Sequence, residues 1–211
     1  MRKIILLTIL LSISSFALTL DQVRADINKN ANSGDSTEIK IQTTVNTIAG
    51  RQVVSVYIVR KGPNKIYSEI KSPLINQRSV VNGNRMKVID LNTQKFQIQA
   101  YNGEVLESLA YTKFNPLDTG NWKQPKFVSN NVYAIEGDNA TLYYNAKKKR
   151  IEKMVSEDSQ KSVLSTYSYD GEGRFKAMNT SVIAKGIETK VSTEVLMLRS
   201  SKDFPDRLFE F

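Results

Sequence analysis

Apolar and polar residues alternate along most of the chain, with turn-forming residues between the alternating runs. The clearest example is Val53–Asp90, where breaks fall at Gly62-Pro63-Asn64, at Pro73 and at Asn82-Gly83. Proline fixes φ, whereas glycine and asparagine tolerate positive φ, so these positions favour turns. Asn-Gly between apolar residues is a strong hairpin signal. The pattern predicts consecutive strands in an antiparallel meander.

Similar runs precede and follow this stretch. Glu38–Ile48 alternates strictly, with residues such as Ile39 and Ile41 on one side and Glu38 and its polar neighbours on the other, which predicts a strand with one wet face that carries Glu38. The other alternating runs are Lys95–Ala100, Val132–Glu136, Ala140–Asn145, Ile151–Ser156, Val163–Tyr169, Arg174–Ala184 and Ile187–Leu198. About eleven strands, with turn signals at spacings of roughly eight to twelve residues, predict a mainly β fold built on a large antiparallel sheet or barrel.

One clear helix is predicted, over Leu18–Asn32. Its apolar residues recur at spacings of three and four and form a single stripe: Leu20, Val23, Ile27 and Ala31. Thr19 and Gln22 fit a capping box at its start, and Gly34 is placed to end it. Such a helix needs a sheet on which to lay its stripe.

The segment Tyr101–Asn131 has no period of two and contains no predicted strand. Val105, Leu106, Leu109 and Phe114 are spaced for one short amphipathic helix, which irregular chain around Trp122 follows. Long insertions of this kind are usually lids or binding loops. A plain surface excursion is the alternative, because unordered insertions are also well tolerated. For residues from about 103 to 130, both interpretations stay open at this point.

The first 17 residues have the layout of a secretory signal peptide. Arg2-Lys3 precedes the apolar run Ile4–Ile13, and Ser15 and Ala17 supply small residues at the cleavage positions. We expect cleavage after Ala17, with an uncleaved membrane anchor as the alternative. Residues 18–211 then suit a single domain. The aromatic tail Phe204–Phe211 is expected to dock on that domain.

The composition excludes several kinds of chemistry. There is no cysteine and no histidine, so the chain has no disulfide, no thiol nucleophile and neither of the commonest zinc ligands. The carboxylates are scattered, which leaves a two-carboxylate glycosidase open without favouring it. No glycine loop for phosphate and no nucleic-acid-binding module is recognisable. We expect no enzymatic activity, no cofactor, no metal and no nucleic-acid partner.

The predicted mature chain is basic, with 28 basic and 21 acidic residues and a formal charge of +7. Such a charge favours anionic surfaces such as phospholipid head groups, but it also serves plain solubility. The sharpest charge cluster is Lys147–Arg150. We expect it to lie at the tip of a hairpin, with an anion site as the less favoured alternative.

The most informative apolar feature is Val53–Val59, which is apolar on both faces except at Ser55. A sheet with two apolar faces either has helices on both sides or encloses a cavity. One of these faces could pack against the leading helix or the inserted segment. Because only one good helix is available, we infer a cavity open at one side that would hold apolar ligands such as acyl chains. A core filled by side chains is the alternative.

At this point the sequence resembles the LolA-like family of periplasmic carriers that sort outer-membrane lipoproteins. The similarity lies in a helix directly after the signal peptide and in three motifs. These are Val56–Lys65, similar to a strand ending in a basic–Pro–basic turn; Val80–Asn84 followed by Val88–Asp90, similar to the family's hairpin; and the ending Asp206–Phe211. Two positions depart from the family pattern: Gly62 intrudes before Pro63, and Met86 replaces an aromatic residue.

The resemblance implies an incomplete antiparallel barrel that helices close and a concave face that holds lipoprotein acyl chains, or a similar lipid, during transfer across the periplasm. It also implies a lid at the inserted segment, an inner-membrane donor, an outer-membrane acceptor and a monomer. The family's lipid-anchored receptor carries a cysteine that this chain lacks, which favours the soluble carrier.

The expected lining residues come from two strands and from the lid, and which strand face points inward stays open. They are Val54, Val56, Ile58, Phe96, Ile98, Leu106, Leu109, Phe114 and Trp122. The rival hypothesis is an exported structural or interaction protein whose sheet serves a protein partner and holds no lipid.

Overall fold

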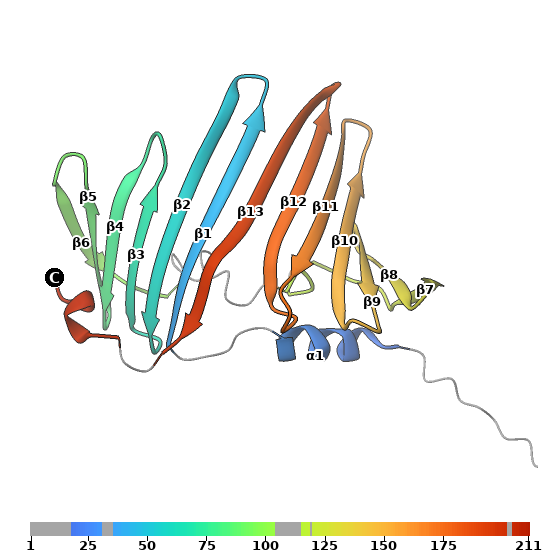
Figure 1. Cartoon of the computed structure of the whole chain (residues 1–211), viewed down its shortest axis with the longest axis horizontal. Coiled ribbons are helices and arrows are strands. Elements are labelled where there is room, and N and C mark those ends of the chain that lie inside the picture. The colour runs from blue at the N-terminus through green and yellow to red at the C-terminus, as the bar shows by residue number, and fades with distance from the viewer. Residues whose placement is uncertain (1–17, 31–35, 104–114, 119, 202–203) are drawn as a thin grey trace, which may run out of the picture.

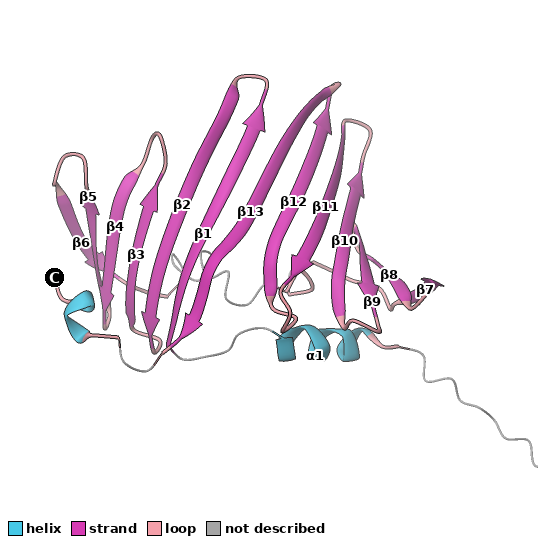
Figure 2. Ribbon diagram, in the orientation of Figure 1, coloured by secondary structure: helices cyan, strands magenta, loops and turns pink. Residues whose placement is uncertain are grey.

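A computed structural model describes residues 18–30, 36–103, 115–118, 120–201 and 204–211, so the predicted signal peptide lies outside the described residues. The described residues form one open antiparallel sheet of 13 strands, with a helix near the N-terminus and a short 3-10 helix near the C-terminus (Figures 1 and 2). In chain order the elements are α1 (Leu20–Asn30), β1 (Ser36–Thr47), β2 (Gly50–Lys61), β3 (Lys65–Lys71), β4 (Asn76–Asn82), β5 (Arg85–Asp90), β6 (Phe96–Ala100), β7 (Lys126–Ser129), β8 (Val132–Glu136), β9 (Thr141–Asn145), β10 (Arg150–Glu157), β11 (Lys161–Tyr169), β12 (Phe175–Ala184), β13 (Ile187–Ser200) and η2 (Asp206–Phe209).

The sheet consists of two meanders joined at its centre. The strand order is β6-β5-β4-β3-β2-β1-β13-β12-β11-β10-β9-β8-β7. Strands that follow one another in the sequence are therefore neighbours in the sheet, except β6 and β7, which form its two open edges. At the centre β1 pairs with β13, although the two are far apart in the sequence. The predicted mainly β, incompletely closed antiparallel fold with a leading helix is confirmed.

The segment expected to lack strands contains β7. Its four residues pair with β8, and Trp122 forms a further bridge with Gly137. All four residues of β7 are exposed, so no alternation of apolar and polar residues marked it. The prediction of a strand-free segment over Tyr101–Asn131 was therefore wrong at its C-terminal end.

The start of α1 has the predicted capping box. The Thr19 amide donates to Gln22 Oε1 at 2.9 Å, and the Gln22 amide donates to Thr19 Oγ1 at 3.2 Å. These two bonds satisfy N–H groups that have no partner within the helix. The expected stop at Gly34 lies outside the described residues. Neither described helix is long and apolar enough to span a membrane.

Helix α1 lies across the ends of β9 to β12, far from the strand that follows it (Figure 1). Its stripe is buried in what we call the covered cluster: Leu20, Val23, Ile27, Leu117, Ile135, Leu142, Tyr144, Ile151 and Tyr167. Asp26 fixes the helix further, because it accepts from the Tyr144 hydroxyl at 2.7 Å and from Lys149 Nζ at 3.2 Å. The helix therefore does not cover Val53–Val59, which was one of its expected positions.

The basic cluster Lys147–Arg150 forms the turn between β9 and β10, as expected. Lys148 Nζ lies 2.7 Å from Glu152 Oε1. The guanidinium of Arg150 stacks over the Tyr169 ring, with Cζ 4.9 Å from the ring centre. Together with the bond from Lys149 to Asp26, these contacts supply structural partners for three of the four residues of the cluster.

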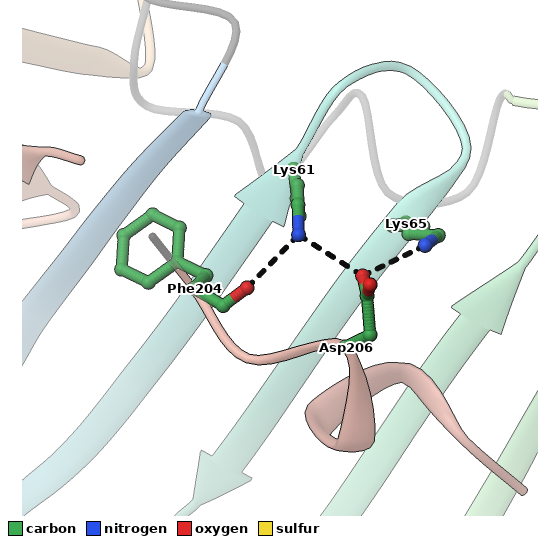
Figure 3. Close-up of polar contacts among 4 residues, drawn as sticks. All are labelled: Lys61, Lys65, Phe204 and Asp206. Atoms are coloured by element: carbon green, nitrogen blue, oxygen red, sulfur yellow. Dashed lines mark hydrogen bonds and ion pairs between the residues drawn. The ribbon is translucent and has the colours of Figure 1, made fainter. Parts of the chain in front are cut away.

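The tail docks on the other side of the sheet, as predicted. Phe204 and Phe209 are buried against Val59 in the tail cluster, which also contacts Tyr57, Tyr67 and Leu208. Two lysines hold the tail in place (Figure 3). Lys61 Nζ donates to the Phe204 carbonyl and to Asp206 Oδ1, both at 3.0 Å, and Lys65 Nζ lies 2.8 Å from the same carboxylate oxygen.

Candidate functional site

The register of the strands assigns each apolar residue to one of two faces, because directly opposed residues in antiparallel strands project to the same side. One row crosses the sheet from β2 to β11 and ends beneath α1: Val54, Thr43, Thr193, Met178 and Tyr167. We call its side the helix face. Another row crosses from β2 to β6 on the side that the tail covers: Val59, Tyr67, Val80, Lys87 and Ile98. We call this side the tail face.

The helix face of the first meander carries a second apolar cluster, separate from the covered cluster. This strand cluster consists of Ile39, Ile41, Val56, Ile58, Ile66, Val81 and Met86, with Val54, Ile70, Val88, Tyr101, Val195 and Leu198 packed against it. No residue of α1 belongs to it. Three of the predicted lining residues, Val54, Val56 and Ile58, lie together here.

A strip of half-buried valines extends the helix face beyond the strand cluster, toward the hairpin turns. Val45 of β1 opposes Val191 of β13, and Val182 of β12 opposes Val163 of β11. All four are partly exposed, and none belongs to any of the three clusters formed by the described residues. We call these residues the valine strip. Figure 1 shows α1 at the other end of these strands.

The polar groups beside the valine strip are paired with one another. Thr43 Oγ1 and Thr193 Oγ1 lie 3.0 Å apart, and Ser165 Oγ and Thr180 Oγ1 lie 2.8 Å apart. Because each hydroxyl has a partner, this part of the helix face does not need a polar ligand to satisfy buried groups. The surface is therefore suited to an apolar ligand.

The predicted lining set does not form one surface. Phe96 and Ile98 pair with Ile89 and Lys87 of the neighbouring strand and lie on the tail face. Val54 lies on the helix face, so the three residues do not all share a face. Trp122 packs against the covered cluster on the helix face. Leu106, Leu109 and Phe114 lie outside the described residues.

Sequence reasoning missed the valine strip. The alternation within β11, β12 and β13 was visible, but it does not reveal which residues of different strands share a face. That assignment needs the register of three strand pairs: β1 with β13, β13 with β12, and β12 with β11.

The tail face carries charged groups as well as exposed apolar side chains such as Phe96, Ile98 and Leu164. Glu38, expected on a wet face, is buried: its carboxylate accepts from the Tyr57 hydroxyl at 2.5 Å and pairs with Arg199. The expectation failed because these two partners compensate the buried charge. Burial first, and then the bond to Glu38, raises the pKa of Tyr57 to about 12.

A second carboxylate on the tail face has the same arrangement. Glu69 accepts from the Tyr67 hydroxyl and from Arg78, whose Nε and Nη2 lie 2.9 and 2.8 Å away. Burial alone would raise the pKa of Glu69, but hydrogen bonds from Tyr67 and Arg78 outweigh it and lower this pKa. Both networks rigidify the tail face, and neither holds a nucleophile beside a base.

Two further kinds of site can be assessed in the part of the chain that the structure describes. No group of three or more acidic residues there is arranged to hold a metal ion. A shallow depression of about 370 Å³, mainly on the tail face, is lined by polar residues such as Asn46, Asn179 and Ser192 and by Leu164 and Val191, and most of its lining surface is apolar. Of the valine strip only Val191 lines it, so it does not coincide with the apolar candidate on the helix face.

Comparisons with known proteins place the fold. No protein-family model and no curated protein matches the sequence. Among solved structures, a LolA superfamily protein from Nitrosomonas europaea is similar at a TM-score of 0.51 and 16% identity, over 92% of this chain and 99% of that one. A putative outer membrane lipoprotein-sorting protein domain from Vibrio parahaemolyticus gives a TM-score of 0.50 and 7% identity, over 89% and 94%.

A DUF1329 family protein from Desulfovibrio piger ATCC 29098 is similar at a TM-score of 0.50 and 12% identity, over 89% of this chain and 97% of that one. The likeness extends over nearly the whole of all three solved chains. The protein therefore has a LolA-like fold.

Proposed function

We propose that the protein is a non-enzymatic carrier that shields acyl chains of lipoproteins, or of a similar lipid, on the helix face of its sheet. The observation that carries the proposal is the valine strip, a partly exposed apolar surface that continues the strand cluster. Burying acyl chains there would be favourable by about 0.8 kcal/mol per methylene.

The fold is compatible with this function. One solved structure of the same fold is described as a putative outer membrane lipoprotein-sorting domain. By this likeness we propose transfer through the periplasm, from an inner-membrane donor to an outer-membrane acceptor, after cleavage of the signal peptide. Movement of the inserted segment at about 103–130 would gate entry of the acyl chains.

The first experiment asks whether the protein holds lipid. The protein is purified from its exported form without detergent and extracted with organic solvent, and the extract is analysed by mass spectrometry. Binding of a fluorescent fatty acid is measured in parallel. We expect acyl lipids in the extract and saturable binding of the probe. An extract free of lipid together with no binding of the probe would contradict the carrier and favour a sheet that serves a protein partner.

A matched set of variants tests the face. Val54→Asn and Val191→Asn each place an amide on the helix face, and we expect each to weaken binding of the fluorescent fatty acid about tenfold, because a buried valine contributes roughly 1.5 kcal/mol. Val53→Asn is the control, since Val53 is also half-buried but lies on the tail face. Equal weakening by all three variants would contradict a site on the helix face.

A further inference from the structure

The two edges of the sheet differ in their protection against pairing with another strand. At one edge, β7 is short, follows Pro125 and is interrupted by a bulge between Phe127 and Ser129. Proline, bulges and short length are devices by which proteins prevent edge strands from pairing. At the other edge, β6 is also short, but it has neither a proline nor a bulge: Phe96–Ala100 pairs with β5 in unbroken register.

The backbone of β6 presents hydrogen-bonding groups at the open edge. The Asp90 amide donates to the Lys95 carbonyl at 2.9 Å, and the Tyr101 amide donates to the Asn84 carbonyl at 2.8 Å. Hydrogen-bonding direction alternates along a strand. Lys95, Gln97, Gln99 and Tyr101 therefore face β5, whereas the N–H and C=O groups of Phe96, Ile98 and Ala100 point outward. Among the described residues no strand pairs with that outer side.

The same three residues present an apolar surface. Their side chains lie on the tail face, where Phe96 is 62% exposed and Ile98 is 42% exposed. The backbone groups at the edge and the apolar side chains thus belong to one short stretch, Phe96–Ala100. An exposed apolar edge strand of this kind is a template for another strand.

The geometry points to a second copy of this chain as the strand that pairs with β6, in an antiparallel dimer centred on Ile98. Among the registers that would pair the outward-pointing N–H and C=O groups of two β6 strands, this one pairs all three such residues of each copy. Ile98 opposes the partner's Ile98, and Phe96 opposes the partner's Ala100, so that a large side chain meets a small one. Because the twofold axis is perpendicular to the sheet, the two tail faces become continuous.

Charge is compatible with this pairing. Lys95 opposes the partner's Tyr101 and not a second lysine. Lys87 Nζ lies 4.6 Å from the centre of its own Phe96 ring. The two Lys87 residues would be separated by three strand spacings, roughly 14 Å, which exceeds the screening length of about 8 Å at physiological ionic strength. The pairing strand is short, so we expect a weak dimer that depends on concentration.

The absence of cysteine allows a direct test by cross-linking. In Ile98→Cys the two introduced thiols occupy a hydrogen-bonded pair, whose Cα atoms lie about 5.5 Å apart, within the range for a disulfide. We expect mild oxidation to convert this variant to a covalent dimer that reductant reverses. Phe96→Cys is the control: its two copies lie four residues apart along the paired strands, roughly 13 Å, and should not cross-link. Equal cross-linking of both variants would overturn the proposal.

Sedimentation of the unmodified protein gives an independent test. We expect the mass to rise toward twice that of the monomer as concentration increases. Ile98→Lys places two charges at the twofold axis and should raise the dissociation constant at least tenfold, whereas Phe127→Lys on β7 should leave it unchanged. A single monomer mass for the unmodified protein at all concentrations would refute the dimer and agree with the monomer expected from the sequence. Neither outcome bears on lipid binding, so this proposal and the carrier function fail separately.

Discussion

Tyr67 and Glu69 show how the tail face accommodates charge beside apolar rings. The Tyr67 hydroxyl donates to Glu69, and Arg78 contacts the same carboxylate. The guanidinium of Arg78 also lies over the Tyr67 ring, with Cζ 5.6 Å from its centre. One carboxylate is thus compensated by a neutral donor and a cation, which offsets the cost of its partial burial.

This arrangement makes the titration of Tyr67 a sensitive probe. Burial first, and then the hydrogen bond to Glu69, raises the pKa of Tyr67 from 10.0 to about 12. Folding therefore favours the neutral phenol, and the stability that this adds is complete below pH 10.0 and is lost as the pH rises through about 12. We expect Glu69→Gln to lower the Tyr67 pKa, measured by NMR of tyrosine labelled at Cζ. An unchanged pKa would contradict the role of Glu69.

Gly137 is required by the close approach of Trp122. A Cβ atom built at Gly137 would lie 2.7 Å from both Cε3 and Cζ3 of the indole. We expect Gly137→Ala to displace the indole, to change the emission of this single tryptophan and to lower the free energy of unfolding by about 1–3 kcal/mol. Gly171→Ala is the control, because nothing lies within 4 Å of its Cβ position. Similar effects of both substitutions would contradict the contact.

At the scale of the elements, single substitutions can test how the C-terminal tail packs on the sheet. Phe209 of η2 is fully buried against the tail face of β2, whereas Phe211 is 44% exposed. We expect Phe209→Ala to lower the free energy of unfolding by about 3–5 kcal/mol, measured by urea denaturation. Phe211→Ala should cost less than about 1 kcal/mol, the worth of its exposed stacking with Arg85. Equal costs would show that the tail does not pack as described.

Most strands could be predicted because alternation and turn residues are local signals. Asn82-Gly83 ends β4 where expected, and Gly83 has a φ of 66° that other residues rarely adopt. β7 could not be predicted in the same way, because a short strand exposed on both faces has no alternation. The capping box of α1 was also local, and it was predicted correctly.

The location of the candidate site could be predicted only in part. The stripe of α1 showed that the helix needs a sheet, but not that it would pack on β8 to β11. Val54, Val56 and Ile58 were placed together because they lie on one strand. Phe96 was grouped with Val54 although the two lie on different faces of the sheet, because the orientation of Phe96 depends on the register through four intervening strand pairs.

At the scale of the whole molecule, the N-terminal and C-terminal regions meet in the middle of the sheet. Helix α1 precedes the first meander but packs on the second, and the tail follows the second meander but packs on the first (Figure 1). Each terminal segment therefore crosses to the half of the sheet to which it does not belong in sequence. These two crossings, together with the pairing of β1 with β13, hold the two meanders together.

The central join determines when this protein can finish folding. Neighbouring strands of a meander can pair as soon as both have been synthesised, but β1 must wait for β13, the last strand of the chain. Contacts between such distant segments form slowly, because the loop between them must close first. Until then β1 and β12 each present an unpaired edge, which favours aggregation. A chain truncated before Ile187 would keep both edges permanently, and we expect it to be a substrate for proteases and chaperones rather than a shorter working protein.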